Sequence, residues 1–455
     1  MNSPVQTIDP LTVLQQLVEM AIKSGASDAD ALITDSVVLG VSQRLNEREG
    51  LERSESRDLG LRVLVGKQQA IVSSTDLSSK SLEALVERAV AMAKLAPRDE
   101  YQGIADYLAV NTDITASDVR RLDLIDPVEP TVEWLSSLAE EAEEAARKVP
   151  KISNSDGANA GWSRTKAHMV SSNGFQGSQE ATRHSLSVSV LAGSGTAMES
   201  DYDYSVSIYG RDIGDPKTIG RTAGERAVAK LNPQTVMTLK APVVFENHIA
   251  NFLLRSFIGA INGNSIARGT SFLKDQLGEL VFNPEITIID DPLRIRGFRS
   301  RLFDGDGLKT EARKFIDNGV LTSWMMDLRS AKQLGFSSTG HASRSTASPP
   351  SPSPSNLYFA PGAVSRADLI ADIKQGFFVT GLMGFGVNGV TGDYSQGASG
   401  FWIENGEITY PVSGVTIAGN LKDMFRDLTL ADDLEFRSGI DSPTARTDSL
   451  TIAGN

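Results

Sequence analysis

The sequence predicts an α+β protein made of two units, and three observations lead to this prediction. The chain has 455 residues, which exceeds the usual size of one domain. In its first half, patterns of helical period alternate with patterns of strand period. In its second half, short apolar runs are separated by glycine turns. We therefore expect an N-terminal α+β domain over residues 1–238, an antiparallel sheet with helices, and a mostly antiparallel β domain over residues 239–455.

The N-terminal unit should begin with a helix at Pro10. Asp9 is a suitable N-cap, proline is favoured at the first helical position, and apolar residues then recur every three or four positions as far as Gly25. Apolar and polar residues alternate over 37–41 and again over 59–65, which predicts two strands.

The rest of the N-terminal unit also shows the helical and the strand period. Gly66-Lys67 predicts a turn into a third strand over 70–73, so that the strands form an antiparallel meander. Further helices are expected near 82–93, 131–149 and 216–231, and further strands near 186–190 and 202–208.

Two Asn-Gly pairs indicate hairpins in the C-terminal unit. Asn318-Gly319 and Asn405-Gly406 are flanked by strand-forming residues, a strong short-range hairpin signal. We expect the sheets of this unit to be closed or sandwiched. The segment 346–356, TASPPSPSPSN, is rich in proline and serine and is expected to be a mobile surface loop.

Charge and hydropathy exclude several partners. The net charge of −13 opposes general attraction to phosphate backbones, so we expect no direct nucleic-acid binding. The nearest basic group, Arg294, Arg296, Arg299 and Arg301, alternates with apolar or small residues and predicts a solvated strand edge. No run reaches the roughly 18 apolar residues of a membrane helix, and the N-terminus lacks a secretory pattern. We therefore expect a cytoplasmic protein without a membrane partner.

The usual catalytic patterns are missing. The chain has no cysteine, which excludes thiol chemistry, and no serine has a histidine placed to activate it. Gly384 to Gly389 matches GxGxxG without a following helix pattern, so we interpret it as a glycine-rich wall that an extended peptide can approach. Asp304-Gly305-Asp306-Gly307 lacks the other ligands of a calcium loop and is interpreted as a turn. His341 is interpreted as a hydrogen-bonded structural residue, with a cleft position as the alternative.

Several longer motifs occur together and in order. They are Ser337-Ser338-Thr339-Gly340-His341, Thr391-Gly392-Asp393-Tyr394-Ser395, Gly400-Phe401-Trp402-Ile403-Glu404-Asn405-Gly406-Glu407 and Thr416-Ile417-Ala418-Gly419-Asn420-Leu421-Lys422-Asp423-Met424. With these motifs and the segment 242–272, the chain resembles the TldD/TldE (PmbA) family, on its TldE side.

Metal-bearing members of this family carry His-Glu-x-x-x-His after two leucines. Here Leu253 and Leu254 are followed by Arg255 and Ala260 at the two ligand positions and by Ser256 at the general-base position. The family's third ligand, a cysteine, is missing as well. A guanidinium, a methyl and a hydroxyl cannot replace two imidazoles and a carboxylate. The resemblance therefore implies no metal in this chain and zinc in a partner subunit.

Residues around this degenerate helix, near 250–260, are candidates for a substrate cleft. Arg255 has two open roles, filling the vacated site or binding a substrate carboxylate. The other candidates are Asn262, Asn264 and Arg268 in a glycine-punctuated loop, and Asp393 and Tyr394, which the resemblance puts near a substrate channel.

The resemblance implies a function shared between two chains. We expect a non-catalytic, metal-free subunit of a heteromeric zinc metalloprotease, whose TldD-like partner carries zinc and hydrolyses unfolded peptides or leader peptides. The alternative is a stand-alone, homodimeric regulatory protein of the gyrase-modulator type without peptidase activity. An independent metal-free hydrolase ranks last, because no nucleophile with an evident base is present.

Overall fold

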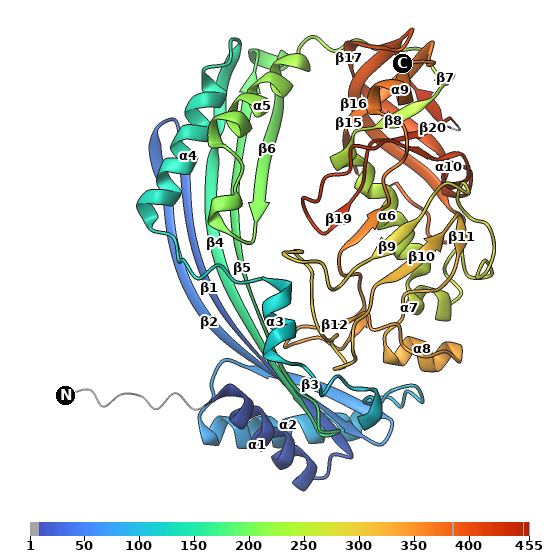
Figure 1. Cartoon of the computed structure of the whole chain (residues 1–455). Coiled ribbons are helices and arrows are strands. Elements are labelled where there is room, and N and C mark those ends of the chain that lie inside the picture. Colours follow the sequence, from blue (N-terminus) through green and yellow to red (C-terminus); the bar gives the residue numbers. More distant parts are fainter. Residues whose placement is uncertain (1–8, 385, 449, 455) are drawn as a thin grey trace.

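The computed structural model describes residues 9–384, 386–448 and 450–454, and its first half is built on one long antiparallel sheet. The strand order is β3-β2-β1-β4-β5-β6. Figure 1 shows this N-terminal sheet as a curved wall on the left of the molecule. Its strands are β1 (Asp28–Arg44), β2 (Glu47–Val65), β3 (Gln68–Ser74), β4 (Ile152–Ser171), β5 (Gln176–Ala192) and β6 (Glu199–Ser207).

Helices cover two separate parts of this sheet. α1 (Pro10–Lys23) and α2 (Ser79–Leu95) pack at its lower end, whereas α4 (Val132–Arg147) and α5 (Pro216–Ala229) cover the outer face of its upper part (Figure 1). The short α3 (Ala116–Leu122) lies in the connection to α4. The predicted start of α1 is confirmed, since the Asp9 carboxylate accepts a hydrogen bond from the Thr12 amide at 3.2 Å.

The C-terminal unit holds an eight-stranded and a five-stranded sheet. Both are mainly antiparallel, but β8 pairs with β15 and β14 with β19 in parallel. The larger sheet has the order β18-β20-β8-β15-β16-β17-β21-β7 and the smaller one β11-β10-β9-β14-β19. The strands are β7 (Leu239–Lys240), β8 (Val243–Phe245), β9 (Ile288–Asp290), β10 (Arg313–Asp317), β11 (Val320–Leu321), β12 (Ala342–Ser343), β13 (Ser351–Pro352), β14 (Leu357–Phe359), β15 (Gln375–Met383), β16 (Asp393–Glu404), β17 (Glu407–Asn420), β18 (Thr429–Leu430), β19 (Ile440–Asp441), β20 (Ala445–Thr447) and β21 (Thr451–Ala453).

Helix α6 (Asn247–Ile261) is the centre of this unit. Its buried Leu253, Leu254 and Phe257 share one core with residues of both sheets, because its apolar face repeats at the helical period. The other helices are α7 (Gly263–Ala267), α8 (Leu328–Leu334), α9 (Arg366–Ile370) and α10 (Leu421–Asp427). The predicted α+β fold class is confirmed; the boundary at 238/239 stays a prediction, although none of the described sheets mixes strands from both sides of it.

Both predicted hairpins are confirmed. Asn318-Gly319 connects β10 to β11 and has φ angles of 49° and 80°, and Asn405-Gly406 connects β16 to β17 with 50° and 79°. Positive φ at both central residues is the type I′ geometry that Asn-Gly favours.

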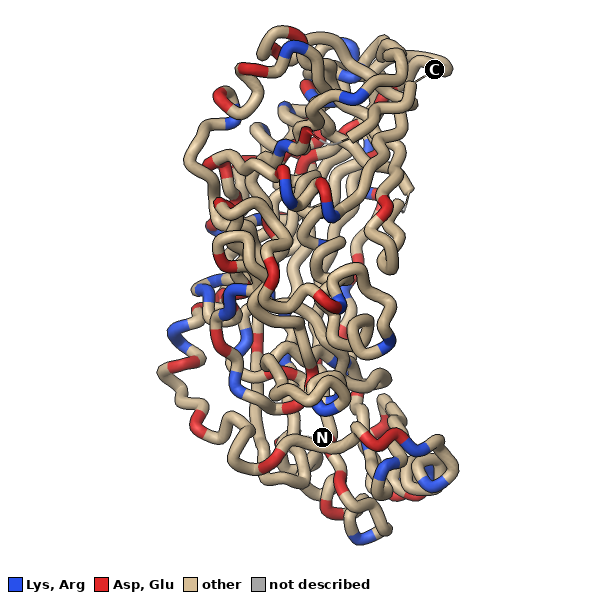
Figure 2. The backbone as a smooth tube through the Cα atoms, turned by 90° about the vertical axis from the view of Figure 1, so that its right-hand side faces the viewer, with Lys and Arg blue, Asp and Glu red and all other residues tan. Residues whose placement is uncertain are grey.

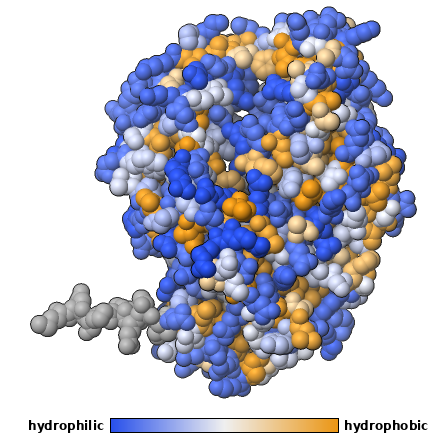
Figure 3. Space-filling model, viewed as in Figure 1, coloured by the Kyte–Doolittle hydropathy of each residue, from blue (hydrophilic) through white to orange (hydrophobic). Residues whose placement is uncertain are grey.

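The two units meet along a seam that has its own apolar core. Leu32 and Met169, on the inner face of the N-terminal sheet, cluster with Phe303 and Leu308 of the C-terminal unit. In the space-filling view, openings remain between the units in the upper half of the molecule, whereas the lower half is closed (Figure 3).

The proline-rich segment 346–356 is part of this seam, which corrects the expectation of a surface loop. Pro350, Pro352 and Pro354 are buried. The Thr346 carbonyl oxygen approaches the backbone of Gly60 so closely that a Cβ added at Gly60 would lie 2.1 Å from it. Proline has no N–H group to leave unsatisfied, so a proline-rich strand can be buried against a sheet at little polar cost.

Candidate functional site

The three vacated metal-motif positions lie on α6 but have different surroundings. Arg255 is exposed, and it makes no hydrogen bond or ion pair within the described part of the chain. The Ser256 hydroxyl donates to the Phe252 carbonyl at 2.8 Å, one turn back along the helix. Ala260 is buried in the core. Arg255 therefore does not fill a void left by a metal, as one of the two predicted roles required.

These residues do not fit a zinc ion. The three positions offer one cation, one hydroxyl that is engaged with backbone and one methyl group, whereas zinc takes imidazole, thiolate or carboxylate ligands. No group of three His, Cys, Asp or Glu side chains is placed to hold a metal among residues 9–384, 386–448 and 450–454. We therefore derive no step of a reaction through zinc in this chain.

Asn262, Asn264 and Arg268 follow α6, and two of them line a cavity. Asn262 caps α7 by accepting from the Asn264 amide at 3.0 Å, and its Nδ2 donates to the Pro352 carbonyl at 3.2 Å. Asn264 and Arg268 line a cavity of about 300 Å³ at the seam, which we call the loop cavity. Its wall also contains Arg62, Gln102, Asp306, Arg329, Pro349 and Pro350.

Asp393 and Tyr394 point to opposite sides of β16, as neighbours on a strand must. Asp393 is exposed and accepts hydrogen bonds from the Thr391 hydroxyl at 2.6 Å and from Asn420 Nδ2 at 3.0 Å. Tyr394 is only 2% exposed and stacks on Phe252 at 5.3 Å between ring centroids. Burial raises the pKa of its phenol. The structure thus places Tyr394 in the core, which corrects its expected position in a cleft.

Beside the loop cavity, a buried cluster of four charged side chains joins the two units. Asp30 of β1 pairs with Arg62 of β2, whose Nε lies 2.7 Å from the carboxylate, and with Arg344 of the C-terminal unit. Arg62 also lies 3.6 Å from the Asp306 carboxylate. We call these residues the paired cluster. None of their side chains is more than 3% exposed.

The pKa values of the two carboxyl groups in the paired cluster are shifted in opposite directions. Burial disfavours the charge of Asp30, but the adjacent Arg344 and Arg62 outweigh it and lower the pKa of this carboxyl. For Asp306, burial and the nearby charge of Asp304 dominate and raise the pKa to about 7. The predicted turn at 304–307 is confirmed, because the Gly307 amide donates to the Asp304 carbonyl at 3.0 Å.

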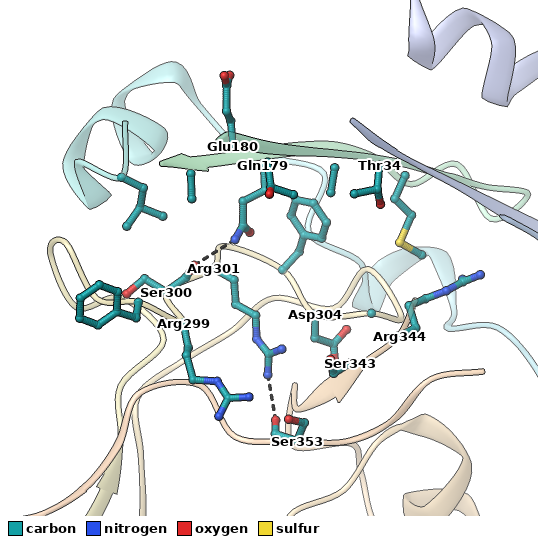
Figure 4. Close-up of a pocket in the computed structure, with 18 of the residues that line it drawn as sticks. Thr34, Gln179, Glu180, Arg299, Ser300, Arg301, Asp304, Ser343, Arg344 and Ser353 are labelled. Carbon is teal, nitrogen blue, oxygen red and sulfur yellow. Dashed lines mark hydrogen bonds between the residues drawn. The ribbon is translucent and has the colours of Figure 1, made fainter. Parts of the chain in front are cut away.

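A larger cavity, of about 470 Å³, lies between the inner face of the N-terminal sheet and the segment 297–305. We call it the sheet cavity. Gln179 reaches down from β5 towards this segment, whereas the side chains of Arg299 and Arg301 leave the segment on its other side, away from the sheet and towards Ser353, where they line the cavity (Figure 4). Gln179 Nε2 donates to the Ser300 carbonyl at 2.9 Å. Its polar wall consists of Thr34, Ser163, Thr165, Gln179, Arg183, Arg299, Ser300, Arg301, Asp304, Ser343, Arg344 and Ser353.

The sequence pattern misassigned the arginines of this region. Residues 294–301 form successive turns rather than a strand, so their side chains do not share one edge. Arg294 lies over the Phe436 ring and Arg296 pairs with Asp123 at 2.6 Å, whereas Arg299 and Arg301 face the cavity. Gly297 lies within the pattern and Pro292 just before it, and these two residues were the signal available in the sequence.

His341 lies in the core of the C-terminal unit, as the structural interpretation predicted. It is 2% exposed, its Nε2 lies 3.0 Å from the Asp290 carboxylate and its Nδ1 lies 2.7 Å from the Thr339 carbonyl. These contacts use both ring nitrogens, so this residue is held in place by structure.

Comparison with known families covers most of the chain. Three family models match in chain order: the PmbA/TldA metallopeptidase domain 1 over residues 29–93, the central domain over 125–231 and the C-terminal domain over 238–454. The first and central domains both contribute strands to the N-terminal sheet.

Full-length relatives carry the same names. The chain is 38% identical over 441 residues to a "Metalloprotease PmbA homolog" of Haemophilus influenzae, covering 96% of this chain and 94% of the relative. It is 36% identical to "Metalloprotease PmbA" of Escherichia coli O157:H7, and the match covers 97% of this chain and 96% of that relative. A "Metalloprotease TldD homolog", also of Haemophilus influenzae, is 24% identical, and the match covers 88% of this chain and 87% of that relative.

The structure agrees with these matches. It superposes with a TM-score of 0.89 on a proposed modulator of DNA gyrase from Bacteroides thetaiotaomicron, at 28% identity and with 98% of each chain covered. None of the helices in the described part of the chain has the length and apolar character of a bilayer span. The family predicted from the motifs is confirmed, and the chain belongs to the PmbA/TldE family.

Proposed function

We propose that this chain is the metal-free subunit of a two-component zinc metalloprotease, in which a TldD-like partner carries the metal and performs hydrolysis. Helix α6 carries the proposal. The resemblance matches it to the family's motif helix, and its apolar face is packed in the core, yet it carries Arg255, Ser256 and Ala260 where the motif has its ligands and base. A fold that is maintained around a vacated site indicates that the fold itself is still used.

The pairing of relatives in one organism supports a two-chain function. Haemophilus influenzae has both a PmbA homologue, 38% identical to this chain, and a TldD homologue, 24% identical. The resemblance implies that two such chains differ at the metal motif, which fits a division of labour. One supplies the metal chemistry, and the other closes the space in which an extended peptide is held away from bulk water.

Peptide cleavage tests the proposal. An unstructured peptide is incubated with this chain alone, with the His-Glu-x-x-x-His relative from the same genome alone, and with an equimolar mixture. We expect cleavage in the mixture, its loss on adding chelator and its return on adding zinc. Cleavage by this chain alone in the presence of chelator would overturn the assignment.

A matched control identifies the catalytic chain. In a second mixture, the motif glutamate of the partner is replaced by glutamine, which keeps the shape and removes the base. We expect this mixture to assemble, as judged by size-exclusion chromatography, but not to cleave. A mixture that still cleaves would move the chemistry to this chain.

The second candidate function is that of a stand-alone regulator. It is favoured by the similarity to the proposed gyrase modulator of Bacteroides thetaiotaomicron. This function requires a homodimer that changes supercoiling by gyrase without any TldD-like chain. A supercoiling assay with the purified chain, with and without its partner, separates the two candidates.

A further inference from the structure

The sheet cavity contains arginines that lack acidic partners. Arg183, Arg299 and Arg301 all line it, and none forms an ion pair with a residue that the structure describes. Arg183 donates to the Phe298 carbonyl at 2.7 Å and Arg301 to the Ser353 carbonyl at 3.0 Å, so their hydrogen bonds go to neutral groups. Arg301 Nε is buried without any partner.

The carboxylates that act on these arginines or line the cavity are used elsewhere. One of them, Asp290, accepts a hydrogen bond from the Ser355 amide at 2.8 Å and lies 3.0 Å from His341 Nε2. Glu180 lies at the cavity wall but points away from Arg301, and it pairs with Arg164 (Figure 4). Asp304 accepts from the backbone amides of Asp306 and Leu308, both at 2.9 Å, and from that of Ala342 at 3.0 Å. Its charge attracts Arg301 without forming an ion pair, and burial raises the pKa of this carboxyl.

The arginines also repel one another. Burial lowers the pKa of Arg299 first, and the charges of Arg301, Arg255 and Arg183 lower it further, while the charge of Asp290 offsets part of this effect. Arg255 therefore adds to the positive field at Arg299, which connects the vacated face of α6 to the cavity. Arg299 and Arg301 are half-buried and Arg183 is exposed. A guanidinium that loses water is normally paired, because desolvating it without a counter-charge costs free energy. In a chain of net charge −13, a group of arginines without ion pairs is not a consequence of composition.

The distribution of charge over the chain favours a peptide over a nucleic acid as the ligand of the sheet cavity. Along the backbone, basic and acidic residues are interspersed over the face shown in Figure 2 rather than gathered in one stripe. A nucleic-acid groove would need such a stripe, and a 470 Å³ cavity at a protein seam holds only a few residues of a peptide. The neutral wall groups Thr34, Thr165 and Gln179 provide hydrogen-bonding partners for an extended backbone on the sheet side of the same cavity.

We propose that the sheet cavity binds a carboxylate of an extended peptide, held by Arg183, Arg299 and Arg301. This inference rests on the proposed function and adds a substrate class to it: peptides with a free C-terminal carboxylate or an acidic side chain. Guanidinium groups bind carboxylates through charge-assisted, often bidentate hydrogen bonds, and they do so most strongly where water is excluded. The unoccupied donors of Arg301 and Arg299 supply that chemistry.

Calorimetric titration of the full chain tests the proposal with four synthetic octapeptides. Two have a central Glu-Glu pair and two a central Gln-Gln pair, and each is made with a free or an amidated C-terminus. We expect the peptide without any carboxylate to bind at least about tenfold more weakly than the fully acidic one. The two intermediate peptides show which carboxylate is recognised. Equal affinity for all four would overturn the proposal.

Two variants locate the binding to the cavity. Arg299→Gln and Arg183→Gln keep a hydrogen-bonding side chain and remove one charge each, and we expect each to weaken binding of the acidic peptide about tenfold. Arg88→Gln, at an exposed position of α2, is the matched control and should leave the affinity unchanged. Circular dichroism confirms that each variant is folded. Unchanged affinity in both cavity variants would place the peptide elsewhere.

Inorganic phosphate and single-stranded DNA are titrated under the same conditions as competing ligand classes. Tighter binding of either than of the acidic peptide would contradict the assignment to peptides. Because the titration needs no partner, its failure together with cleavage by the mixture would remove this inference and leave the proposed function intact. Carboxylate-dependent binding without cleavage by the mixture would support the binding site and remove the proposed function.

Discussion

Two groups of arginines lie at the same seam, and they differ in what neutralises them. In the paired cluster, Arg62 and Arg344 share the Asp30 carboxylate, and all these side chains are buried. In the sheet cavity, Arg299 and Arg301 face a space of about 470 Å³ and have only neutral hydrogen-bond partners or none. Each guanidinium of the first group has a carboxylate partner within the chain, whereas Arg299 and Arg301 form no ion pair with a described residue.

The difference separates a structural use of charge from a binding use. A buried cation with its counter-ion in place fixes the geometry of two units relative to each other, and removing either partner is costly. A cation that faces a cavity without an ion pair gains less from the fold, and its remaining donors are available to a ligand. Substitutions in the two groups should therefore have opposite effects on stability.

The largest effect should come from Asp30→Ala. It leaves the Arg62 and Arg344 guanidiniums buried without their shared counter-ion, so we expect the free energy of unfolding to fall by about 3–5 kcal/mol. Chemical denaturation followed by circular dichroism measures it. Asp35→Ala on the same strand is the control, because its pair with Arg57 is solvent-accessible, and it should cost about 0.2–1 kcal/mol. Similar losses in both variants would remove the distinction between a structural and a surface pair.

A smaller effect, dependent on pH, should come from Asp306→Asn. The folded pKa of Asp306, about 7, lies above its ordinary value of 3.8, so its contribution to stability is complete below pH 3.8 and is lost as the pH rises through 7. The variant lacks this titration. We therefore expect its stability relative to the native chain to increase between pH 4 and pH 8, by up to about 4 kcal/mol, since each unit of difference between the folded and ordinary pKa corresponds to about 1.4 kcal/mol.

Denaturation curves at several pH values measure this difference. Three histidines, His168, His184 and His248, have lowered pKa values and shift native stability in the opposite direction, but they are common to both proteins and cancel in the comparison. Parallel pH profiles for the native chain and the variant would show that Asp306 is not a strained member of the paired cluster.

The smallest effect on stability should come from Arg299→Gln in the sheet cavity. The substitution removes a partly buried charge that is repelled by Arg301, Arg255 and Arg183, so the chain should be unchanged or up to about 1 kcal/mol more stable. Thermal denaturation at low and high salt measures it, and the gain should shrink at high salt because the repulsion is screened. A loss comparable to that of Asp30→Ala would mean that Arg299 supports the fold.

Local signals in the sequence were sufficient for much of the fold. The Asp9-Pro10 start of α1 and the two Asn-Gly hairpins depend on residues that are adjacent in the chain, and the structure contains all of them. The prediction of a surface loop over 346–356 was wrong, because this segment is buried against Gly60, nearly 300 positions away in the chain. The composition of the segment alone does not reveal a contact of this kind.

The site was less accessible to sequence reasoning. The motif positions on α6 were found because a family pattern marks them, and Asn264 and Arg268 do line a cavity. Arg299 and Arg301 were assigned to a strand edge, since their alternation resembles a strand and the turns around Gly297 were overlooked. Arg183 and Arg344 approach them from other elements, and the charge balance of such a cavity exists only once the chain has folded.

The central claim is that this chain contributes structure and peptide binding to a hydrolysis performed by another subunit. Cleavage of an unstructured acidic peptide by this chain, by its zinc-motif relative and by their mixture, each with and without chelator, tests it most directly. We expect cleavage only in the mixture without chelator. Cleavage by this chain alone, with chelator present, would contradict the account and require a nucleophile within these 455 residues.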